Sequence, residues 1–434
     1  MRLLYSLLWW IALPLLPLRL WWRARREPGY AEHVGERFGR YAGSAPPGPV
    51  LWLHAVSLGE TRASAPLVRR LLDAYPQATL LLTHMTATGR AAGRELWGER
   101  VVQAWLPYDL PFAVRGFLRR FRPVAGLLME TEVWPNLVRL ARADDVPLFL
   151  VNARLSERSA AGYAKAGRLA RVAFAGLSGV AAQSPADARR IATLGSAPPV
   201  VTGNLKFDVE LSGEARALGR ELRRRFGDRR PLWVAASTRD GEEAVLLDAL
   251  AGGALPPGTL TVVVPRHPQR FDAVAALLSG RGIAFVRRSD GLPVAAGVRV
   301  VLGDTMGEML GYCAAADVVF VGGSLLPLGG QNLIEPIAAG RPTLVGPHMF
   351  NFADATANAV AAGAARQVAD ADALVAAVST LLEDPEARAA MAAAAAAFHA
   401  AHRGATDRLW AWLTPALDAA LAVRVARTIP RDGG

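Results

Sequence analysis

The sequence predicts an α/β fold made of two similar halves, each a parallel sheet covered by helices. Short apolar runs alternate with helical stretches, and this rhythm restarts after a polar, basic segment at residues 208–230. The chain has 434 residues, which is more than one hydrophobic core commonly supports. Two domains of the same class are therefore expected.

The apolar runs give the expected strands in order along the chain. In the first half they are residues 50–53, 79–82, 124–129, 148–151 and 179–182, with a further strand end at 200–202. In the second half they are residues 232–236, 261–264, 298–302, 318–321 and 343–345. Residues 384–417 are rich in alanine and are expected to be helical.

Composition limits the classes of protein to consider. The net charge is +11, which favours anionic partners such as a phosphorylated lipid, a membrane surface or nucleic acid. Nucleic acid has only this charge in its favour, because no motif interleaves aromatic and basic residues. A single cysteine, Cys313, excludes internal disulfides and cysteine-based zinc sites. Lys165 and Lys206 are the only lysines in an arginine-rich chain, so each is worth noting.

The N-terminal segment, residues 1–22, is predicted to hold the protein at a membrane. Residues 3–18 are apolar apart from Ser6, and tryptophan pairs at 9–10 and 21–22 suit the membrane interface. The segment is about long enough to cross a bilayer as one helix. Arginines at 23, 25 and 26 place the rest of the chain on the cytoplasmic side. Prolines at 14 and 17 leave open a shallow helix in the interface instead.

A glycine-rich loop follows the apolar run at 318–321 and precedes a predicted helix start near Asn332 to Glu335. Glycines let a backbone approach a ligand closely, and a helix N-terminus attracts phosphate. Glu335 is placed to bind the hydroxyls of a ribose, so the segment indicates a nucleotide site. The alternative is a capping box between Asn332 and Glu335 in an ordinary loop.

Polar residues also collect after the other expected strands, where open α/β folds bind their ligands. Two such edges facing each other would form a cleft between the domains. These polar segments are residues 54–60, 130–132, 152–154, 183–184, 203–206, 237–239, 265–268 and 304–308.

Several of these segments together resemble the bacterial 3-deoxy-D-manno-octulosonic acid (Kdo) transferases. The resemblance runs in the family's order from about residue 5 to the last helices. Its motifs are residues 52–60, 130–136, 203–208, 265–268, 303–308 and 322–336. The chain departs from the family's usual pattern at Arg239, Gln331 and Leu333-Ile334.

The resemblance implies a GT-B fold of two Rossmann-like domains facing a cleft. It implies transfer of Kdo from CMP-Kdo to a lipid A precursor (lipid IVA) in lipopolysaccharide inner-core synthesis. We expect direct displacement with inversion, no cofactor, no metal, no nucleic-acid partner, and a place on the cytoplasmic side of the inner membrane. Two alternatives stay open: a GT-B transferase that uses another nucleotide-sugar on a different membrane lipid, and an inactive sugar-nucleotide-binding protein.

The resemblance also assigns the catalytic residues. Glu60 is expected to be the base, and Glu130 with Lys206 to stabilise the transition state. The structural alternative for Glu60 is a carboxylate that favours the N-terminus of a helix at 61–74. For Glu130 and Lys206 the alternative is an ion pair that only supports the fold.

The CMP site is expected in the second half. By resemblance its residues are Pro265, Arg266, Met306, Gly307, Glu308, Asn332, Leu333, Ile334 and Glu335. Thr305 and Glu308 also have the residue types and spacing of a capping box, so the alternative role for Glu308 is to cap a helix. The one Asp-x-Asp sequence, at 370–372, is interpreted as a helix cap rather than a metal site.

The expected domain boundaries follow from these assignments. They are a membrane anchor at 1–22, an acceptor-binding domain at 23–207, a linker at 208–230, a CMP-sugar-binding domain at 231–400, and a C-terminal helix that packs back, with a tail, at 401–434.

Overall fold

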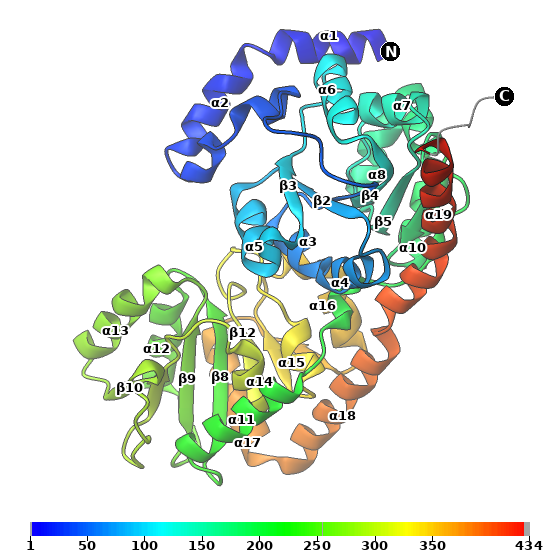
Figure 1. Ribbon diagram of the computed structural model, residues 1–434. Helices are drawn as coiled ribbons and strands as arrows, with labels where there is room; N and C mark the ends of the chain where they lie inside the picture. Colours follow the sequence, from blue (N-terminus) through cyan, green and yellow to red (C-terminus); the bar gives the residue numbers. More distant parts are fainter. Residues whose placement is uncertain (1, 254, 429–434) are drawn as a thin grey trace, which may run out of the picture. The chain divides into compact units, whose positions relative to one another are not determined.

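The computed structural model describes residues 2–253 and 255–428, which form two compact units (Figure 1). The first unit runs to Asp208 and also takes the chain from Gly404 onward, while the second is Val209–Arg403. Each unit has its own parallel sheet with helices on both faces, as the sequence predicts.

The described strands of the first unit form a seven-stranded sheet in the order β3-β2-β1-β4-β5-β6-β7, with every pair parallel. Their bounds are β1 Val50–His54, β2 Thr79–His84, β3 Val102–Trp105, β4 Pro123–Met129, β5 Leu148–Ala153, β6 Gly179–Ala182 and β7 Val200–Val201. The sequence prediction lacks β3, a short strand at the edge of the sheet.

Alternation along β1 divides the core of this unit between the two faces of the sheet. Trp52 packs with Phe117 and Leu137 on one face, while Leu51 and Leu53 pack with the helices of the other. The first face carries α6 (Pro111–Phe121), α7 (Pro135–Ala143), α9 (Arg168–Ala175) and α10 (Pro185–Thr193). The second carries α4 (Ala65–Ala74), α5 (Ala87–Trp97) and the C-terminal α19 (Ala405–Thr428).

Two further short helices, α3 (Leu58–Ala63) and α8 (Glu157–Lys165), belong to the first unit. The helix expected at 61–74 is broken at Ser64 into α3 and α4, because Pro66 begins a new helix there. The helix α8 precedes α9.

The N-terminal segment is two helices, α1 (Arg2–Ala12) and α2 (Leu15–Ala24), rather than the single long helix expected. Pro14 is the N-cap of α2, and the two axes differ by 54°. Across the described residues no single helix has the length and apolar content to cross a bilayer, and this bent pair meets the criterion only when taken together. One side of the pair lies on the first unit, where Leu16 and Leu20 are buried.

The described strands of the second unit form a seven-stranded parallel sheet in the order β10-β11-β9-β8-β12-β13-β14. Their bounds are β8 Leu232–Thr238, β9 Leu260–Pro265, β10 Phe285–Arg287, β11 Val300–Leu302, β12 Val318–Val321, β13 Thr343–Val345 and β14 Ala365–Gln367. The two outer strands, β10 and β14, are absent from the sequence prediction because they are three residues long and only partly apolar.

The helices of this unit also divide between the two faces of its sheet. On one side lie α12 (Glu242–Gly252) and α17 (Ala371–Glu383), and on the other α11 (Gly213–Phe226) and α14 (Met309–Ala315). The remaining helices are α13 (Phe271–Gly280), α15 (Ile334–Ala338), α16 (Ala353–Ala361) and α18 (Pro385–His402).

The stretch expected as a linker is mostly helix α11, which buries Leu222 and Phe226 in the core of the second unit. Its polar residues form only the outer face of an amphipathic helix, which is why the composition resembles that of a linker. The alanine-rich C-terminal stretch is divided, since α18 belongs to the second unit and α19 to the first.

Candidate active site

Glu60 lies in the first turn of α3, directly after β1. Ser57 is the N-cap of this helix, and its Oγ donates to Glu60 Oε1 at 3.1 Å. The other carboxylate oxygen accepts a hydrogen bond from the backbone N–H of Val56 at 2.8 Å. Glu60 therefore makes the contacts of a helix-capping carboxylate, and these same contacts fix its position.

The electrostatic environment of Glu60 differs from that of an ordinary helix cap. The pKa of its carboxyl is raised to about 8, first by burial and then by the nearby charges of Glu130 and Glu132, although the hydrogen bonds from Val56 and Ser57 oppose this rise. A proton acceptor is most effective when its pKa lies near the working pH. The surroundings thus suit a general base, the role predicted for this residue.

Glu130 and Lys206 meet at the carboxyl edge of the same sheet. Lys206 Nζ lies 3.1 Å from Glu130 Oε1, and the two side chains keep 24% and 20% of their surface exposed. Glu130 follows β4 directly and has a φ of 58°, a left-handed conformation that is unfavourable for a residue with a side chain. The two side chains form an ion pair, and their exposed surface lets a ligand reach it.

Asn152, the second-last residue of strand β5, holds the segment that carries Lys206. Its Oδ1 accepts a hydrogen bond from the backbone N–H of Leu205 at 3.0 Å. Its own carbonyl accepts from Gln183 Nε2 at 3.0 Å, and its φ is 49°. The sequence marks Asn152 only as a polar residue at a strand end, and its positioning role appears in the folded chain.

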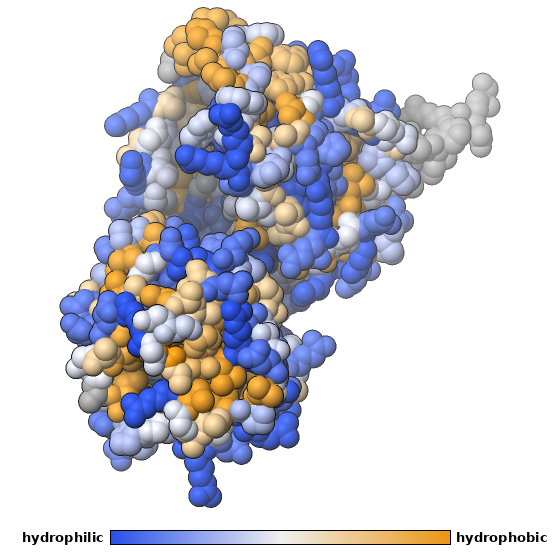
Figure 2. Space-filling view, turned by 90° about the vertical axis from the view of Figure 1, so that its left-hand side faces the viewer, coloured by the Kyte–Doolittle hydropathy of each residue, from blue (hydrophilic) through white to orange (hydrophobic). Residues whose placement is uncertain are grey.

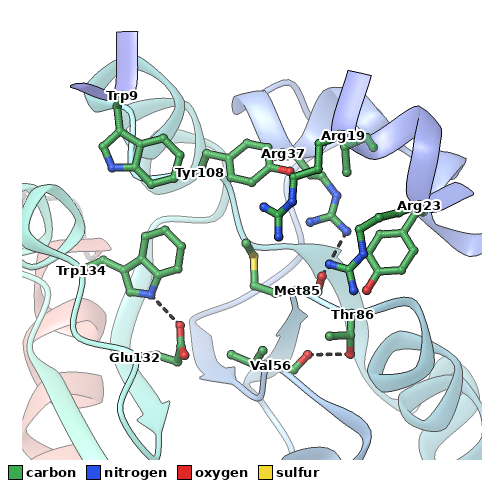
Figure 3. A pocket seen from close by; sticks show the side chains of 12 residues that line it. Trp9, Arg19, Arg23, Arg37, Val56, Met85, Thr86, Tyr108, Glu132 and Trp134 are labelled. Atoms are coloured by element: carbon green, nitrogen blue, oxygen red, sulfur yellow. Dashed lines mark hydrogen bonds between the residues drawn. The ribbon is translucent and has the colours of Figure 1, made fainter. Parts of the chain in front are cut away.

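A basic cavity of about 290 Å³ lies in the first unit, beside the Glu60 loop (Figure 3). Arg19, Arg23 and Arg37 line one side, and Glu132 and Trp134 line the other. Three guanidinium groups in one hollow suit a phosphate or carboxylate ligand. Arg23 and Arg37 belong to a basic segment at residues 23–41, but nothing in the sequence shows that these two residues and Arg19 meet in one cavity.

Trp134 and Glu132 form the wall of this cavity together. Trp134 Nε1 donates to Glu132 Oε2 at 2.6 Å, and the Trp134 ring stacks on Trp9 of α1 with centroids 6.1 Å apart. Burial raises the pKa of Glu132, as does the charge of Glu130, while the Trp134 bond lowers it. Both residues belong to the 130–136 motif, which is the only sequence signal for them.

In the second unit, Pro265 ends β9 and Arg266 follows it at the carboxyl edge of the sheet. The Arg266 backbone N–H donates to the Thr238 carbonyl at 2.9 Å, and its Nε donates to Gln331 Oε1 at 3.3 Å. Gln331 is one of the departures from the family pattern. Here it supports the predicted CMP-binding arginine.

The segment Met306–Glu308 follows β11, which neighbours β9 in the sheet. Met306 is 56% exposed, and Gly307 has a φ of 79°, a conformation that favours glycine. Glu308 accepts hydrogen bonds from Arg288 Nη2 at 3.1 Å and from Thr305 Oγ1. Glu308 is itself the N-cap of α14, so Thr305 does not head a capping box there.

The segment Asn332–Glu335 follows β12 through the glycine loop. The side chains of Leu333 and Ile334 are fully buried, so these two residues can meet a ligand only through their backbone. Asn332 Oδ1 accepts from the Ile334 N–H at 3.1 Å, and Glu335 lies in the first turn of the five-residue helix α15. The N-cap is Leu333, so the expected capping box between Asn332 and Glu335 is not formed.

The sequence led us to expect that the glycine loop holds a phosphate, but at Gly323 the backbone N–H is already bonded within the protein. The backbone N–H groups of Gly323, Ser324 and Leu325 all donate to the carboxylate of Glu242, which is completely buried. Glu242 also accepts from the Arg239 N–H at 2.9 Å. A carboxylate of the protein thus occupies this anion site and fixes the loop.

No group of three or more histidine, cysteine, aspartate or glutamate side chains that could hold a metal ion occurs among residues 2–253 and 255–428. Asp370 of the Asp-x-Asp sequence caps α17 by accepting from the Ala373 N–H at 2.8 Å, as expected.

Comparison with known proteins shows the family to which the chain is related. A family model for 3-deoxy-D-manno-octulosonic-acid transferases matches residues 32–209. The 3-deoxy-D-manno-octulosonic acid transferase of Bordetella pertussis is 49% identical over 91% of this chain and 94% of its own length. That of Haemophilus influenzae is 36% identical over 96% of this chain and 99% of its own length.

Among solved structures, Alr3699/HepE from Anabaena in complex with UDP superposes with a TM-score of 0.57. Its sequence is 16% identical, and the match covers 86% of this chain and 100% of the other. The two parallel sheets covered by helices form the GT-B fold. More narrowly, the chain belongs to the family of Kdo transferases, the enzymes that transfer Kdo in lipopolysaccharide synthesis.

Proposed function

We propose that this chain transfers Kdo from CMP-Kdo to a lipid A precursor, lipid IVA, with inversion at the anomeric carbon. The observation that carries the proposal is the buried Glu60 carboxyl, whose pKa is raised to about 8, in the same electrostatic cluster as Glu130. Lys206 supplies a cation to that cluster. Family membership supports Kdo as the transferred sugar and CMP-Kdo as its source.

In the proposed reaction Glu60 accepts the proton of an acceptor hydroxyl while that oxygen attacks the anomeric carbon of Kdo. The bond from this carbon to the CMP phosphate breaks, and CMP leaves with the bonding electrons. Direct displacement inverts the configuration. Lys206 stabilises the negative charge that develops, and Arg266 binds the CMP phosphate.

The basic cavity supports a phosphorylated acceptor. Arg19, Arg23 and Arg37 converge there, and the burial of Arg37 lowers its pKa, so an anion would compensate a cation that is poorly solvated. The phosphates of a lipid A precursor fit this chemistry.

The outer side of the N-terminal helices supports action at a membrane. Leu3, Leu4, Leu7 and Leu8 of α1 are each more than half exposed, as are Trp21 and Trp22 of α2. Figure 2 shows apolar side chains gathered at the top of the view, over these helices. We propose that the pair binds the cytoplasmic side of the inner membrane, with the arginines after Trp22 held on that side.

A single experiment tests the reaction. Purified chain is incubated with CMP-Kdo and lipid IVA, the product is analysed by mass spectrometry, and its anomeric configuration is determined by NMR. We expect the mass of one or more added Kdo units and an inverted linkage. Retention would exclude direct displacement. Thermal protection by UDP but not by CMP would favour another nucleotide-sugar as the donor.

The metal-free mechanism has its own test. Because Lys206 and Arg266 can supply the positive charge, we expect transfer to persist in EDTA. Loss of activity that magnesium or manganese restores would contradict this mechanism.

A further inference from the structure

A second cavity, of about 470 Å³, lies in the first unit next to the basic one. Its walls come from α1, the loop before α7, and the elbow between α8 and α9. They include the rings of Tyr5 and Tyr163 and the aliphatic side chains of Val133, Leu169 and Ala173. The proposed reaction assigns no role to this cavity.

The hydroxyl groups of the aromatic walls already have hydrogen-bond partners within the protein. Tyr5 Oη donates to Asp109 Oδ2 at 2.9 Å, and Tyr163 Oη donates to the Thr131 carbonyl at 3.2 Å. Apart from Thr131 and Glu132, the walls therefore offer mainly rings and aliphatic groups to an occupant. A cavity with such walls binds apolar groups better than it binds water.

The two cavities share one wall, because Glu132 and Trp134 line both of them. On one side of this wall lie Arg19, Arg23 and Arg37, and on the other lie the apolar walls. A single ligand that fits both must carry an anionic group close to a hydrocarbon chain.

The second cavity also adjoins the exposed apolar surface of α1. Tyr5 faces into the cavity, while its neighbours Leu4 and Leu8 are 53% and 57% exposed. If α1 lies in a bilayer, a lipid chain could pass along this helix into the cavity without crossing water.

We propose that this second cavity, the acyl pocket, binds one acyl chain of the acceptor lipid while a phosphate of the same molecule occupies the basic cavity. The inference rests on the proposed function, which supplies a phosphorylated, acylated acceptor. It adds a determinant of specificity: the protein recognises the chain as well as the head group.

The first test reduces the volume of the acyl pocket by a substitution at its rim. Ala166, at the C-cap of α8, lines the pocket and is half-buried, so Ala166→Phe places a ring inside it. The matched control is Ala164→Phe, on the same helix but exposed and away from the lining. We expect Ala166→Phe to raise KM for vesicle-bound lipid IVA at least tenfold, with KM for CMP-Kdo unchanged. Ala164→Phe should behave like the wild type.

Photocrosslinking gives a second measurement that does not depend on turnover. The full chain is mixed with vesicles that contain a lipid IVA analogue with a diazirine on one acyl chain, and adducts are mapped by mass spectrometry. We expect adducts within residues 163–173 in the wild type and at least fivefold fewer in Ala166→Phe.

The outcomes separate the two proposals. If the wild type transfers no Kdo to lipid IVA, the proposed function fails. If it transfers Kdo but Ala166→Phe retains the wild-type KM, or if the adducts fall only on the outer face of α1, the acyl pocket is wrong. Melting temperatures of both variants show whether an altered KM reflects the pocket or the fold.

Discussion

Glu60 serves the fold and the predicted chemistry with the same carboxyl group. It caps α3 through Ser57 and Val56, yet burial and two neighbouring carboxylates keep it protonated at neutral pH. A base must lose its proton to act, so kcat/KM should rise with pH through about 8. Glu60→Gln should reduce transfer roughly 10²-fold or more with CMP affinity unchanged. A wild-type profile that is flat from pH 6 to 9 would remove Glu60 from this role.

The raised pKa of Glu60 also predicts how the stability of Glu60→Gln relative to the wild type depends on pH. The pKa of Glu60 in the folded chain, about 8, lies above the ordinary value of 4.5, so between these pH values the folded state holds a proton that the unfolded state releases. This contribution to stability is full below pH 4.5 and is lost as pH rises through 8. Glu60→Gln should therefore gain stability relative to the wild type at pH 8 to 9, measured by urea unfolding.

Lys206 is one of two lysines in the chain, and its ammonium contacts Glu130. A guanidinium is larger and planar, so it would carry the charge without the same fit. We expect Lys206→Arg to transfer Kdo at least tenfold more slowly, an activation cost of about 1.4 kcal/mol, with an unchanged melting temperature. The partly exposed pair adds little to stability, which makes this separation measurable. Full activity in the variant, or a parallel loss of fold, would make Lys206 a structural cation.

At the scale of elements, Glu242 of α12 fixes the glycine loop after β12. Removing its carboxylate would leave the N–H groups of Gly323, Ser324, Leu325 and Arg239 without their acceptor. Each buried, unpaired group costs roughly 1–3 kcal/mol, so we expect Glu242→Ala to lose at least about 3 kcal/mol of unfolding free energy. Asp248→Ala, an exposed position on the same helix, is the control and should change stability by less than about 0.5 kcal/mol. Urea unfolding of both variants measures the difference, and equal stability would contradict the role of Glu242.

The N-terminal helices combine an exposed apolar face with a docked one. Replacing Leu3, Leu4, Leu7 and Leu8 by glutamine alters only the exposed face, whereas deleting residues 1–22 also removes the Tyr5–Asp109 bond and the Trp9–Trp134 stacking. We expect both variants to lose most sedimentation with anionic vesicles, while only the deletion lowers the melting temperature. If the glutamine variant still sediments fully, the exposed face is not the membrane-binding surface.

At the scale of the whole molecule, the predicted CMP residues and the predicted base belong to different units. Pro265, Arg266, Met306–Glu308 and Asn332–Glu335 lie in the second unit, whereas Glu60, Glu130 and Lys206 lie in the first. Because a ligand protects what it touches, amide hydrogen exchange with saturating CMP should slow at 266, 306–308 and 332–335. Arg266→Ala should abolish this protection, and protection confined to the first unit would refute the assignment.

The sequence by itself determined the doubled α/β architecture and eleven of its described strands, because short apolar runs that alternate with helical stretches are typical of covered parallel sheets. It also located the predicted site residues, since these follow strand ends. The edge strands β3, β10 and β14 were missed because pairing with a neighbour, rather than local composition, makes them strands.

Only the tertiary structure decided which groups meet. Glu242 reaches the backbone of Gly323 from 81 positions away, and Tyr5 reaches Asp109 across 104. Arg19 and Arg23 of α2 meet Arg37, which lies beyond that helix in the chain, in one cavity. Such contacts depend on long-range packing, and no local pattern in the sequence encodes them. The raised pKa of Glu60 has the same origin, since burial and neighbouring charges arise only when distant segments come together.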